Sequence, residues 1–255
     1  MKRRTIRSPG TGARARKQGG TSPAPGRVAR PLLDWYAAHR RDLPWRRTPS
    51  PYWTLVSEFM LQQTVVAAAI PHFERFVVRL PDLRALAAAS ENEVLALWSG
   101  LGYYTRGRNL HRTARAVVDR HGGELPTDEA ALLELPGVGP YTAAAIAAIA
   151  FGRRTFALDG NAARVVARLA GITAPIDSST TRERLRVVGQ TWVPRLRAGD
   201  FAQAVMELGA TVCVPRKPDC SVCPLVAVCV ARRRNLVASI PVKKSRPQKQ
   251  VVRQF

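Results

Sequence analysis

Residues 132–150 read LLELPGVGPYTAAAIAAIA and join two helical segments through a short glycine-containing turn. We expect the first helix to end near Leu135 and the segment Pro136–Gly139 to form a tight turn, because glycine accepts positive φ angles. Pro140 suits the first turn of the second helix, where its missing N–H costs nothing. The turn leaves backbone N–H groups uncovered beside a helix N-terminus, so it can bind a phosphate, although an ordinary connection between helices has the same pattern.

Helical patterns also dominate the sequence on both sides of this turn. Apolar residues recur at helical spacing, for example at Leu55, Phe59, Val66 and Ile70. No alternating apolar and polar pattern lasts long enough to predict a strand, and no hairpin dipeptide lies between such runs. The sequence therefore predicts an all-α fold, with short connections marked by proline and glycine.

The chain carries a net charge of +22 over 255 residues, and this charge is concentrated at its two ends. Residues 1–30 hold nine Lys and Arg residues and residues 230–255 hold eight, with no acid in either segment; residues 31–229 then have 23 basic and 18 acidic residues, a net +5. We interpret 1–30 as a basic disordered tail and 230–255 as a basic tail or linker. Such charge favours nucleic acid as the partner, although solvated tails without a specific role are the alternative.

Composition argues against two classes of protein. No apolar run approaches the roughly 18 to 20 residues that a membrane span requires, so we expect no membrane partner. No apolar segment follows the basic N-terminus, so we do not expect a secretory signal. The expected location is the bacterial cytoplasm with its nucleoid, or the nucleus or mitochondrion if the source is a eukaryote.

All the cysteines lie in the stretch CVPRKPDCSVCPLVAVC, residues 213–229, with the spacing C-x6-C-x2-C-x5-C. In a chain with no sign of secretion, this clustering favours a metal site over disulfides. From the spacing alone, zinc and an iron–sulfur cluster are both open, although zinc ribbons usually carry two C-x2-4-C pairs.

Several motifs together resemble one known family. The stretch LPGVGPYTA is similar to the helix-hairpin-helix of base-excision DNA glycosylases, and the cysteine spacing is similar to that of their iron–sulfur branch. Within that branch the sequence resembles the adenine DNA glycosylases (MutY type) from about Leu32 to Cys229. The stretches that carry this resemblance are SEFMLQQT (57–64), WSGLGYYTRGRNLH (98–111), LDGN (158–161) and MELGATVC (206–213).

The resemblance implies two helical subdomains with the active site in the cleft between them. The first would be a six-helix barrel over residues 51–157 that contains the helix-hairpin-helix at 132–150. The second would combine residues 31–50 with residues 158–229 and hold the iron–sulfur cluster. Proteins of this type usually continue into a further domain that reads 8-oxoguanine, and we expect that domain to be absent, because the sequence stops after PVKKSRPQKQVVRQF.

The implied reaction is hydrolysis of the N-glycosidic bond of adenine mispaired with 8-oxoguanine or guanine. The leaving base must be protonated, and the oxocarbenium-like sugar needs negative charge nearby. The resemblance assigns protonation of adenine to Glu58, which lies in an apolar helical stretch where burial would raise its pKa. It assigns stabilisation of the cation to Asp159, and orientation of Asp159 or a water to Asn161. The alternatives are a surface Glu58 in the first turn of a helix and an Asp159 that only caps a helix.

Tyr141 distinguishes two branches of the family. In the related bifunctional lyases (endonuclease III type), a lysine at this position attacks the sugar as an amine nucleophile. Tyrosine cannot form a Schiff base, so the resemblance implies a monofunctional adenine DNA glycosylase. Two other readings remain open: a thymine glycosylase for T:G mispairs, which shares this tyrosine, and a DNA-binding module without catalysis.

The implied partner is double-stranded DNA with a mispaired adenine, bound by a monomer. The target base must leave the duplex, and a side chain must fill the gap. The resemblance places Gln63 in the base stack and Tyr103 as a wedge beside the opposite base. Arg106 and Arg108 are expected to contact phosphates, unless they are simply solvated. The complete predicted DNA-binding set is Gln62, Gln63, Tyr103, Arg106, Arg108, Pro136, Gly137, Val138, Gly139, Arg216 and Lys217.

The resemblance also implies the identity of the metal site. It favours one [4Fe–4S] cluster with a mainly structural role. The cluster would hold both ends of the loop 214–219, which would then present Arg216 and Lys217 to a phosphate. The implied ligands are Cys213, Cys220, Cys223 and Cys229.

Overall fold

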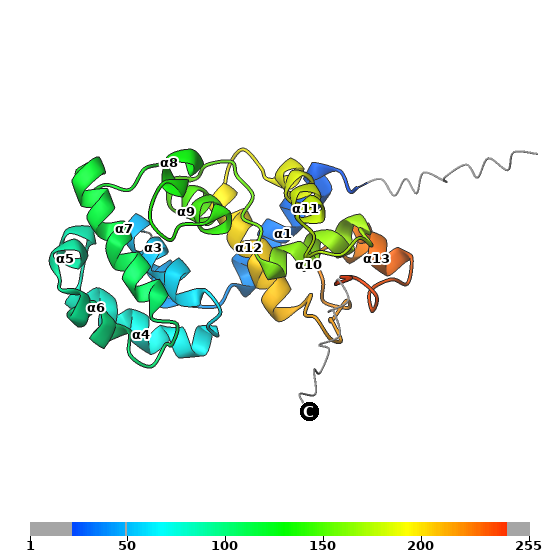
Figure 1. Ribbon diagram of the computed structural model, residues 1–255. Helices are drawn as coiled ribbons and strands as arrows, with labels where there is room; N and C mark the ends of the chain where they lie inside the picture. Colours follow the sequence, from blue (N-terminus) through cyan, green and yellow to red (C-terminus); the bar gives the residue numbers. More distant parts are fainter. Residues whose placement is uncertain (1–21, 49, 244–255) are drawn as a thin grey trace, which may run out of the picture.

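The computed structural model describes residues 22–48 and 50–243, and the regular elements within these ranges are all helices. The predicted all-α class is therefore confirmed. The helices form two groups that lie side by side, one built from residues 51–151 and the other from residues 25–39 and 160–233 (Figure 1). Within the described ranges, no helix has both the length and the apolar character needed to cross a membrane.

The first group encloses a hydrophobic core around Phe59, Phe73, Phe76 and Trp98, whose side chains are fully buried. The rings of Phe76 and Trp98 meet edge to face with centroids 6.2 Å apart, a geometry that stabilises beyond the buried area alone. The helices of this group are α3 (Pro51–Leu61), α4 (Val66–Arg79), α5 (Leu83–Ala88), α6 (Glu91–Trp98), α7 (Thr105–His121), α8 (Glu129–Leu133) and α9 (Pro140–Phe151).

The second group encloses a separate core around Leu32, Tyr36, Trp192 and Phe201. A short helix, α2 (Pro44–Arg47), leads the chain from this group to the first one, where it contacts α3 and α4. The elements of the second group are α1 (Pro25–His39), α10 (Gly160–Ala170), α11 (Ser179–Trp192), α12 (Ala198–Thr211), the 3-10 turn η1 (Val226–Val228) and α13 (Val230–Arg233).

Side-chain caps determine where several helices begin. Ser50, Asp82, Asp128 and Asp159 each accept a hydrogen bond from a backbone N–H in the first turn of the helix that follows. A capping box at Ser90 does the same for α6. These bonds satisfy N–H groups that have no partner inside the helix. At Asp159 the cap also fixes the position of a carboxylate.

The turn between α8 and α9 requires glycine at position 137 for two reasons. The φ of Gly137 is +75°, and a Cβ there would lie 2.5 Å from the Cβ of Asn109 on α7. The Thr113 hydroxyl, also on α7, donates to the Pro136 carbonyl at 2.6 Å and holds the turn against that helix. Pro140 then occupies the first turn of α9, so the predicted pair of helices joined by a tight turn is present.

The predicted boundary of the N-terminal tail at residue 30 is wrong. Helix α1 begins at Pro25 and buries Val28 in the second core. The Trp192 indole donates to the Pro23 carbonyl at 2.9 Å and holds the start of this helix. The neighbouring arginines do not prevent this packing, because their side chains stay exposed to solvent. Residues 1–21, which the same prediction covers, lie outside the described residues.

The predicted boundary at residue 229 is also wrong. Val230, Ala231 and Ile240 are buried and complete the second core. Arg168 Nε on α10 donates to the Ile240 carbonyl at 2.8 Å. The folded part therefore continues past the last cysteine, and residues 244–255 of the predicted tail lie outside the described residues.

The two hydrophobic cores come from different parts of the chain. The first takes its buried residues from the range 52–147, and the second from the ranges 28–36 and 156–240. The assignment of two subdomains at 51–157 and at 31–50 plus 158–229 stays a prediction, since separate cores alone do not make independent units.

Helix α9 forms the junction between the two groups. It packs against α3 and α8 in the first group and against α12 in the second. Most of its buried residues are alanine. Gly199 of α12 approaches so closely that a Cβ there would lie 2.7 Å from the Ala148 carbonyl oxygen of α9. Small residues on both helices thus allow the backbones of α9 and α12 to approach each other closely.

Replacing Gly199 by Ala should lower the free energy of unfolding by about 1–3 kcal/mol, because the added Cβ overlaps a backbone oxygen. Urea denaturation followed by circular dichroism measures this change. Gly26→Ala in α1 is the matched control, since a Cβ there meets nothing within 4 Å and alanine favours the helix. Equal effects of the two substitutions would contradict the close approach of α9 and α12.

Candidate active site

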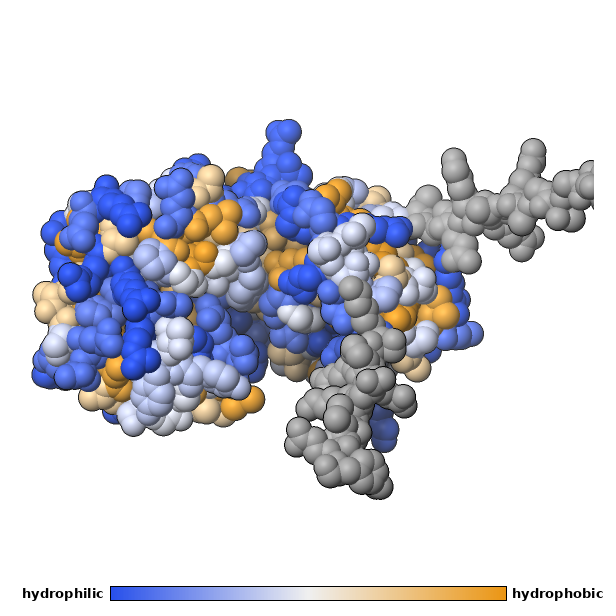
Figure 2. Space-filling view, in the orientation of Figure 1, coloured by the Kyte–Doolittle hydropathy of each residue, from blue (hydrophilic) through white to orange (hydrophobic). Residues whose placement is uncertain are grey.

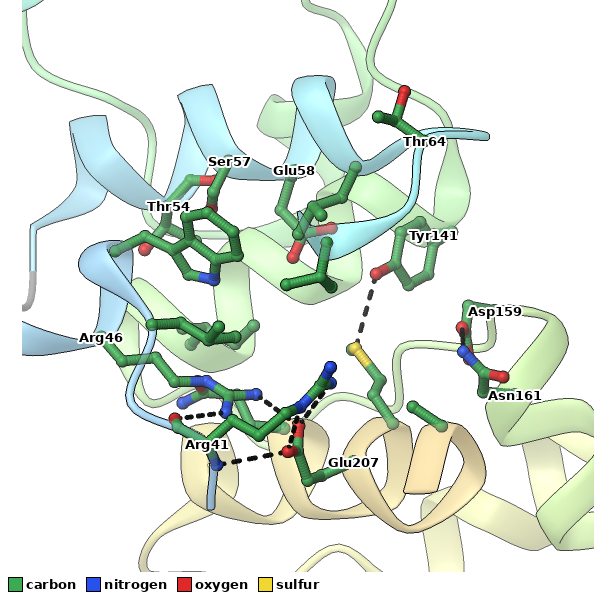
Figure 3. Close-up of a pocket in the computed structure, with 18 residues that line it drawn as sticks. Arg41, Arg46, Thr54, Ser57, Glu58, Thr64, Tyr141, Asp159, Asn161 and Glu207 are labelled. Carbon is green, nitrogen blue, oxygen red and sulfur yellow. Dashed lines mark hydrogen bonds and ion pairs between the residues drawn. The ribbon is translucent and has the colours of Figure 1, made fainter. Parts of the chain in front are cut away.

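A cavity of about 200 Å³ lies between the two groups of helices (Figure 3). Its walls come from α2, α3, α12, both ends of α9 and the first turns of α4 and α10. All the residues with a predicted catalytic role line this one space: Glu58, Tyr141, Asp159 and Asn161. Residues far apart in the sequence therefore meet at the boundary between the groups.

Glu58 projects from α3 and is buried in the wall of the cavity. Its Oε2 atom has no hydrogen-bond partner within the described residues. Burial raises the pKa of the Glu58 carboxyl to about 7; the charge of Asp159 acts in the same direction, while the Tyr141 hydroxyl and Arg46 act against it. A carboxyl with this pKa carries a proton at slightly acidic and neutral pH and can donate it to a bound group.

Tyr141 stands in the first turn of α9 and directs its hydroxyl into the cavity, where a dashed line in Figure 3 marks its contact. The hydroxyl donates to the Met206 sulfur at 3.5 Å. Burial, together with the charges of Glu58 and Asp159, raises the pKa of Tyr141. The hydroxyl therefore stays neutral and acts as a hydrogen-bond donor.

Asp159 lies at the N-terminus of α10, in the other group of helices from Glu58. One of its carboxylate oxygens accepts from the Ala162 N–H at 2.6 Å, and the other accepts from Asn161 Nδ2 at 3.0 Å. Figure 3 shows the Asp159 and Asn161 side chains together at the edge of the cavity. The cap and the amide together hold the carboxylate in one position.

Two buried arginines connect this carboxylate to the cysteine segment. Arg164 donates to Asn161 Oδ1 at 2.8 Å and to the Cys213 carbonyl at 2.8 Å. Arg168, one turn further along α10, donates to the Cys213 sulfur at 3.3 Å and to the next carbonyl of the chain at 2.8 Å. A continuous set of hydrogen bonds thus runs from Asp159 to the first cysteine.

The four cysteines converge on one small cavity beside α10 and α12, and none of them forms a disulfide. Among the described residues, no group of His, Cys, Asp and Glu is arranged to hold a single metal ion. The loop between the first two cysteines leaves Arg216 and Lys217 exposed.

Three charged residues that line the cavity have no predicted role. Glu207 of α12 is almost fully buried and pairs with Arg41 at 2.6 Å and with Arg46 at 3.1 Å. Burial alone would raise its pKa, but the two arginines outweigh burial and hold the pKa of Glu207 below its usual value. An acid inside the apolar stretch FAQAVMELGA is the signal that could have found Glu207. Nothing in the sequence pairs the arginines with it.

Gln63 and Tyr103 share an unusual backbone conformation. Both are exposed, and their φ angles of +57° and +48° lie in the left-handed region that non-glycine residues rarely adopt. Such strain concentrates where a side chain has to be held in a particular direction. Their insertion into a base stack stays a prediction, and exposure is a property that it requires.

The predicted phosphate contact at Arg106 is wrong, because its side chain is buried. The guanidinium donates to the Gln62 carbonyl and, at 3.2 Å, to the Leu101 carbonyl. It also lies 5.4 Å from the centre of the Tyr103 ring. Arg106 therefore ties the loop after α3 to the loop before α7, and so positions Gln63 and Tyr103.

The other predicted DNA contacts have varied surroundings. Arg108 pairs with Glu91 at 3.0 Å on the surface. The Gln62 amide donates to the Thr142 hydroxyl at 3.4 Å. In the hairpin the Val138 side chain is buried, so only its backbone can reach a ligand. The other turn residues are at least partly exposed: Pro136, Gly137 and Gly139.

A protein-family model matches residues 56–190, and it describes an HhH-GPD superfamily base excision DNA repair protein. The matched range begins in α3, ends in α11, and includes Glu58, the hairpin and Asp159. The match therefore covers the two carboxyl groups that have a predicted catalytic role, but not Glu207.

Curated adenine DNA glycosylases are similar to this chain. The protein from Homo sapiens is 49% identical over 212 residues, which are 80% of this chain and 39% of the relative. The protein from Mycolicibacterium smegmatis is 43% identical over 195 residues, which are 76% of this chain and 66% of the relative. The chain thus spans about two fifths of the human relative and about two thirds of the bacterial one.

Solved structures share the arrangement of helices. The structure of a thermostable thymine-DNA glycosylase aligns with a TM-score of 0.72 and 29% identity, covering 81% of this chain and 95% of that one. A non-covalent endonuclease III–DNA complex aligns with a TM-score of 0.66 and 22% identity, covering 80% and 93%. The second likeness supports the fold alone.

Replacing Arg106 by Ala should lower the free energy of unfolding by about 3 kcal/mol, because several buried carbonyl oxygens would lose their charged donor. Arg108→Ala is the matched control, since it removes a partly exposed ion pair on the same helix and should cost less than about 1 kcal/mol. Urea denaturation compares the two variants. If Arg106→Ala is as mild as the control, Arg106 does not hold the two loops.

Proposed function

The chain belongs to the HhH-GPD superfamily of base excision DNA repair proteins, and we propose that it is a monofunctional DNA glycosylase that removes adenine mispaired with 8-oxoguanine or guanine. One observation carries the proposal: two carboxyl groups with different surroundings, Glu58 and Asp159, line the same cavity. Hydrolysis of a glycosidic bond assigns different tasks to two such groups.

Glu58 supplies the proton for the leaving base. Its carboxyl has a raised pKa, about 7, and one oxygen without a partner, so a base in the cavity can accept a hydrogen bond and then the proton. Asp159 supplies negative charge beside the sugar as the bond breaks. The Ala162 N–H and the Asn161 amide hold its carboxylate in place, so no rearrangement is needed when the cation forms.

A buried acid favours adenine over thymine as the leaving base. Thymine departs as a comparatively stable anion, whereas adenine must gain a proton on the ring before it leaves. The charged floor of the cavity, formed by Arg41, Arg46 and Glu207 with Gln203, offers both donors and acceptors to a purine edge. The relatives named adenine DNA glycosylase support the same choice.

The lack of a nearby amine supports hydrolysis without strand cleavage. A glycosylase that also cuts the strand needs an amine nucleophile at the sugar. In the described part of the chain the lysines are Lys217 and Lys243, and neither lines the cavity. Tyr141 occupies the cavity wall with a neutral hydroxyl and presents no amine to the sugar.

The surface around the cavity suits a duplex with one base turned out. The exposed hairpin glycines and the N-terminus of α9 offer backbone N–H groups to a phosphate. Gln63 and Tyr103, held by Arg106, would fill the space that the base leaves. Such an enzyme would act as a monomer on DNA in the nucleoid, or in the nucleus or mitochondrion of a eukaryote.

A [4Fe–4S] cluster is the group that the cysteine cavity would hold, with Cys213, Cys220, Cys223 and Cys229 as ligands. When bound, it would supply a rigid cross-link among these cysteines. That cross-link would fix the loop that exposes Arg216 and Lys217, which would reach a phosphate. Arg168 would stay beside the first ligand as a donor to its sulfur.

Replacing Glu58 by Gln should lower single-turnover release of adenine at least ~100-fold while duplex binding is retained, because an amide has no proton to transfer. Duplexes with A:8-oxoguanine, A:G, T:G and A:T, followed by alkali to reveal abasic sites, measure the release. Adenine should leave opposite 8-oxoguanine and guanine only. Glu124→Gln, an exposed substitution away from the cavity, is the matched control. Release of thymine alone, or of nothing, would overturn the proposal.

The rate of adenine release should fall as pH rises through about 7, because Glu58 acts as an acid and its pKa is raised to about that value. Below this pH the carboxyl is protonated and active, and above it the proton is lost. Single-turnover rates between pH 5.5 and 9 give the profile. A rate that increases through this range would assign Glu58 the role of a base.

Purified, anaerobically reconstituted protein should contain roughly four iron atoms per chain and absorb near 400 nm. Cys223→Ser should lower the iron content. It should also make the affinity for DNA less dependent on salt concentration, because the loop with Arg216 and Lys217 loses its support. Zinc in place of iron, measured by plasma emission, would contradict the assignment of the cluster.

A further inference from the structure

Met206 places a reactive sulfur atom inside the catalytic cavity. It projects from α12, lines the cavity, and is only partly buried. Its sulfur accepts a hydrogen bond from the Tyr141 hydroxyl at 3.5 Å, a weak contact for a thioether. The other methionine among the described residues, Met60, is fully buried in the first core. An oxidant that enters the cavity therefore meets one sulfur in the described part of the chain.

We propose that Met206 is a site of oxidation by hydrogen peroxide, and that its sulfoxide closes the catalytic cavity reversibly. The effect on activity rests on the proposed function, whereas the modification itself does not. The reaction is a two-electron oxidation: a sulfur lone pair attacks one peroxide oxygen, an S–O bond forms and the O–O bond breaks. The second oxygen leaves as hydroxide, and the proton on the oxygen now bound to sulfur passes to it, which gives the sulfoxide and water. The sulfur is oxidised and the peroxide is reduced.

The added oxygen changes the cavity in two ways. First, it occupies space in a cavity of only about 200 Å³ that has to admit a base. Second, a sulfoxide oxygen is a much stronger acceptor than a thioether, so it would hold the Tyr141 hydroxyl more firmly than the 3.5 Å contact does now. The Tyr141 hydroxyl also lowers the pKa of the Glu58 carboxyl, so turning this hydroxyl toward a sulfoxide would change the proton donor as well.

The neighbours of Met206 make the change specific to this position. Met206 packs beside Ala144, Ala145 and Ala157, whose small side chains offer no polar partner for a sulfoxide. The new oxygen would therefore turn toward Tyr141 and the open cavity. Glu207, the next residue along α12, forms ion pairs with two arginines. These ion pairs restrict movement of α12 away from the cavity.

The test treats the full-length protein with hydrogen peroxide and measures two quantities. Peptide mass spectrometry gives the fraction of Met206 carrying one added oxygen. Single-turnover release of adenine is expressed relative to the untreated sample of the same variant. We expect activity to fall at least tenfold in step with oxidation of Met206, and methionine sulfoxide reductases A and B together to restore it. Absorbance near 400 nm reports the cluster separately.

Two variants separate Met206 from other targets. Met206→Leu has a similar volume and no sulfur, so peroxide should leave its relative activity within twofold. Met60→Leu is the matched control, and it should lose activity as the unchanged protein does, because Met60 is shielded. Equal losses in Met206→Leu and the unchanged protein would overturn the inference, as the damage would then lie elsewhere.

The remaining outcomes are also decisive. If peroxide oxidises a free methionine peptide but not Met206, the site is not accessible and the inference fails. If Met206 is oxidised and adenine release continues at its normal rate, the inference again fails. Absence of release from the untreated protein would instead overturn the proposed function, while mass spectrometry would still show whether Met206 is the oxidised residue.

Discussion

The close packing of α9 between α3 and α12 is the constraint on which the site depends. Most of the buried residues of α9 are alanine, and α9 packs against Gly199 of α12. The backbones of these two helices, and with them the two groups, therefore lie close together. Glu58 on one side and Asp159 on the other then share a single cavity. A larger residue at this junction would separate the carboxyl groups without changing either of them. The space-filling view shows that polar and apolar side chains are interspersed on the visible surface of both groups of helices (Figure 2).

Three acidic residues around the cavity show how surroundings decide the role of a carboxyl group. Glu58 is buried without a cationic partner in hydrogen-bonding contact, and its pKa rises to about 7. Glu207 is also buried, yet two arginines keep its pKa low. Asp159 accepts two hydrogen bonds at a helix N-terminus. One acid is thus suited to proton transfer, one to structure, and one to electrostatic stabilisation.

Buried arginines connect the loops of this protein more than its surface ion pairs do. Arg164 and Arg168 donate to carbonyls of the cysteine segment, and Arg106 donates to carbonyls of two loops that carry Gln63 and Tyr103. A guanidinium offers five donors in a fixed plane, so one side chain can satisfy several loop carbonyls that have no helical partner. In a strongly basic chain, part of the positive charge is therefore internal and structural.

Several structural features of this protein could be predicted from local sequence alone. The helical class, the glycine turn, the Asp159 cap and the clustered cysteines depend on neighbours within a few residues, so spacing and residue type were enough. The junction, the pairing of Glu207 with Arg41 and the burial of Arg106 depend on contacts between distant segments. The pattern TRGRN cannot tell a buried arginine from a solvated one, because burial is decided by the helices that pack around it. The same reason explains why the tail boundaries at 30 and 229 were misplaced, since a few apolar residues among arginines fold only when a core is there to receive them.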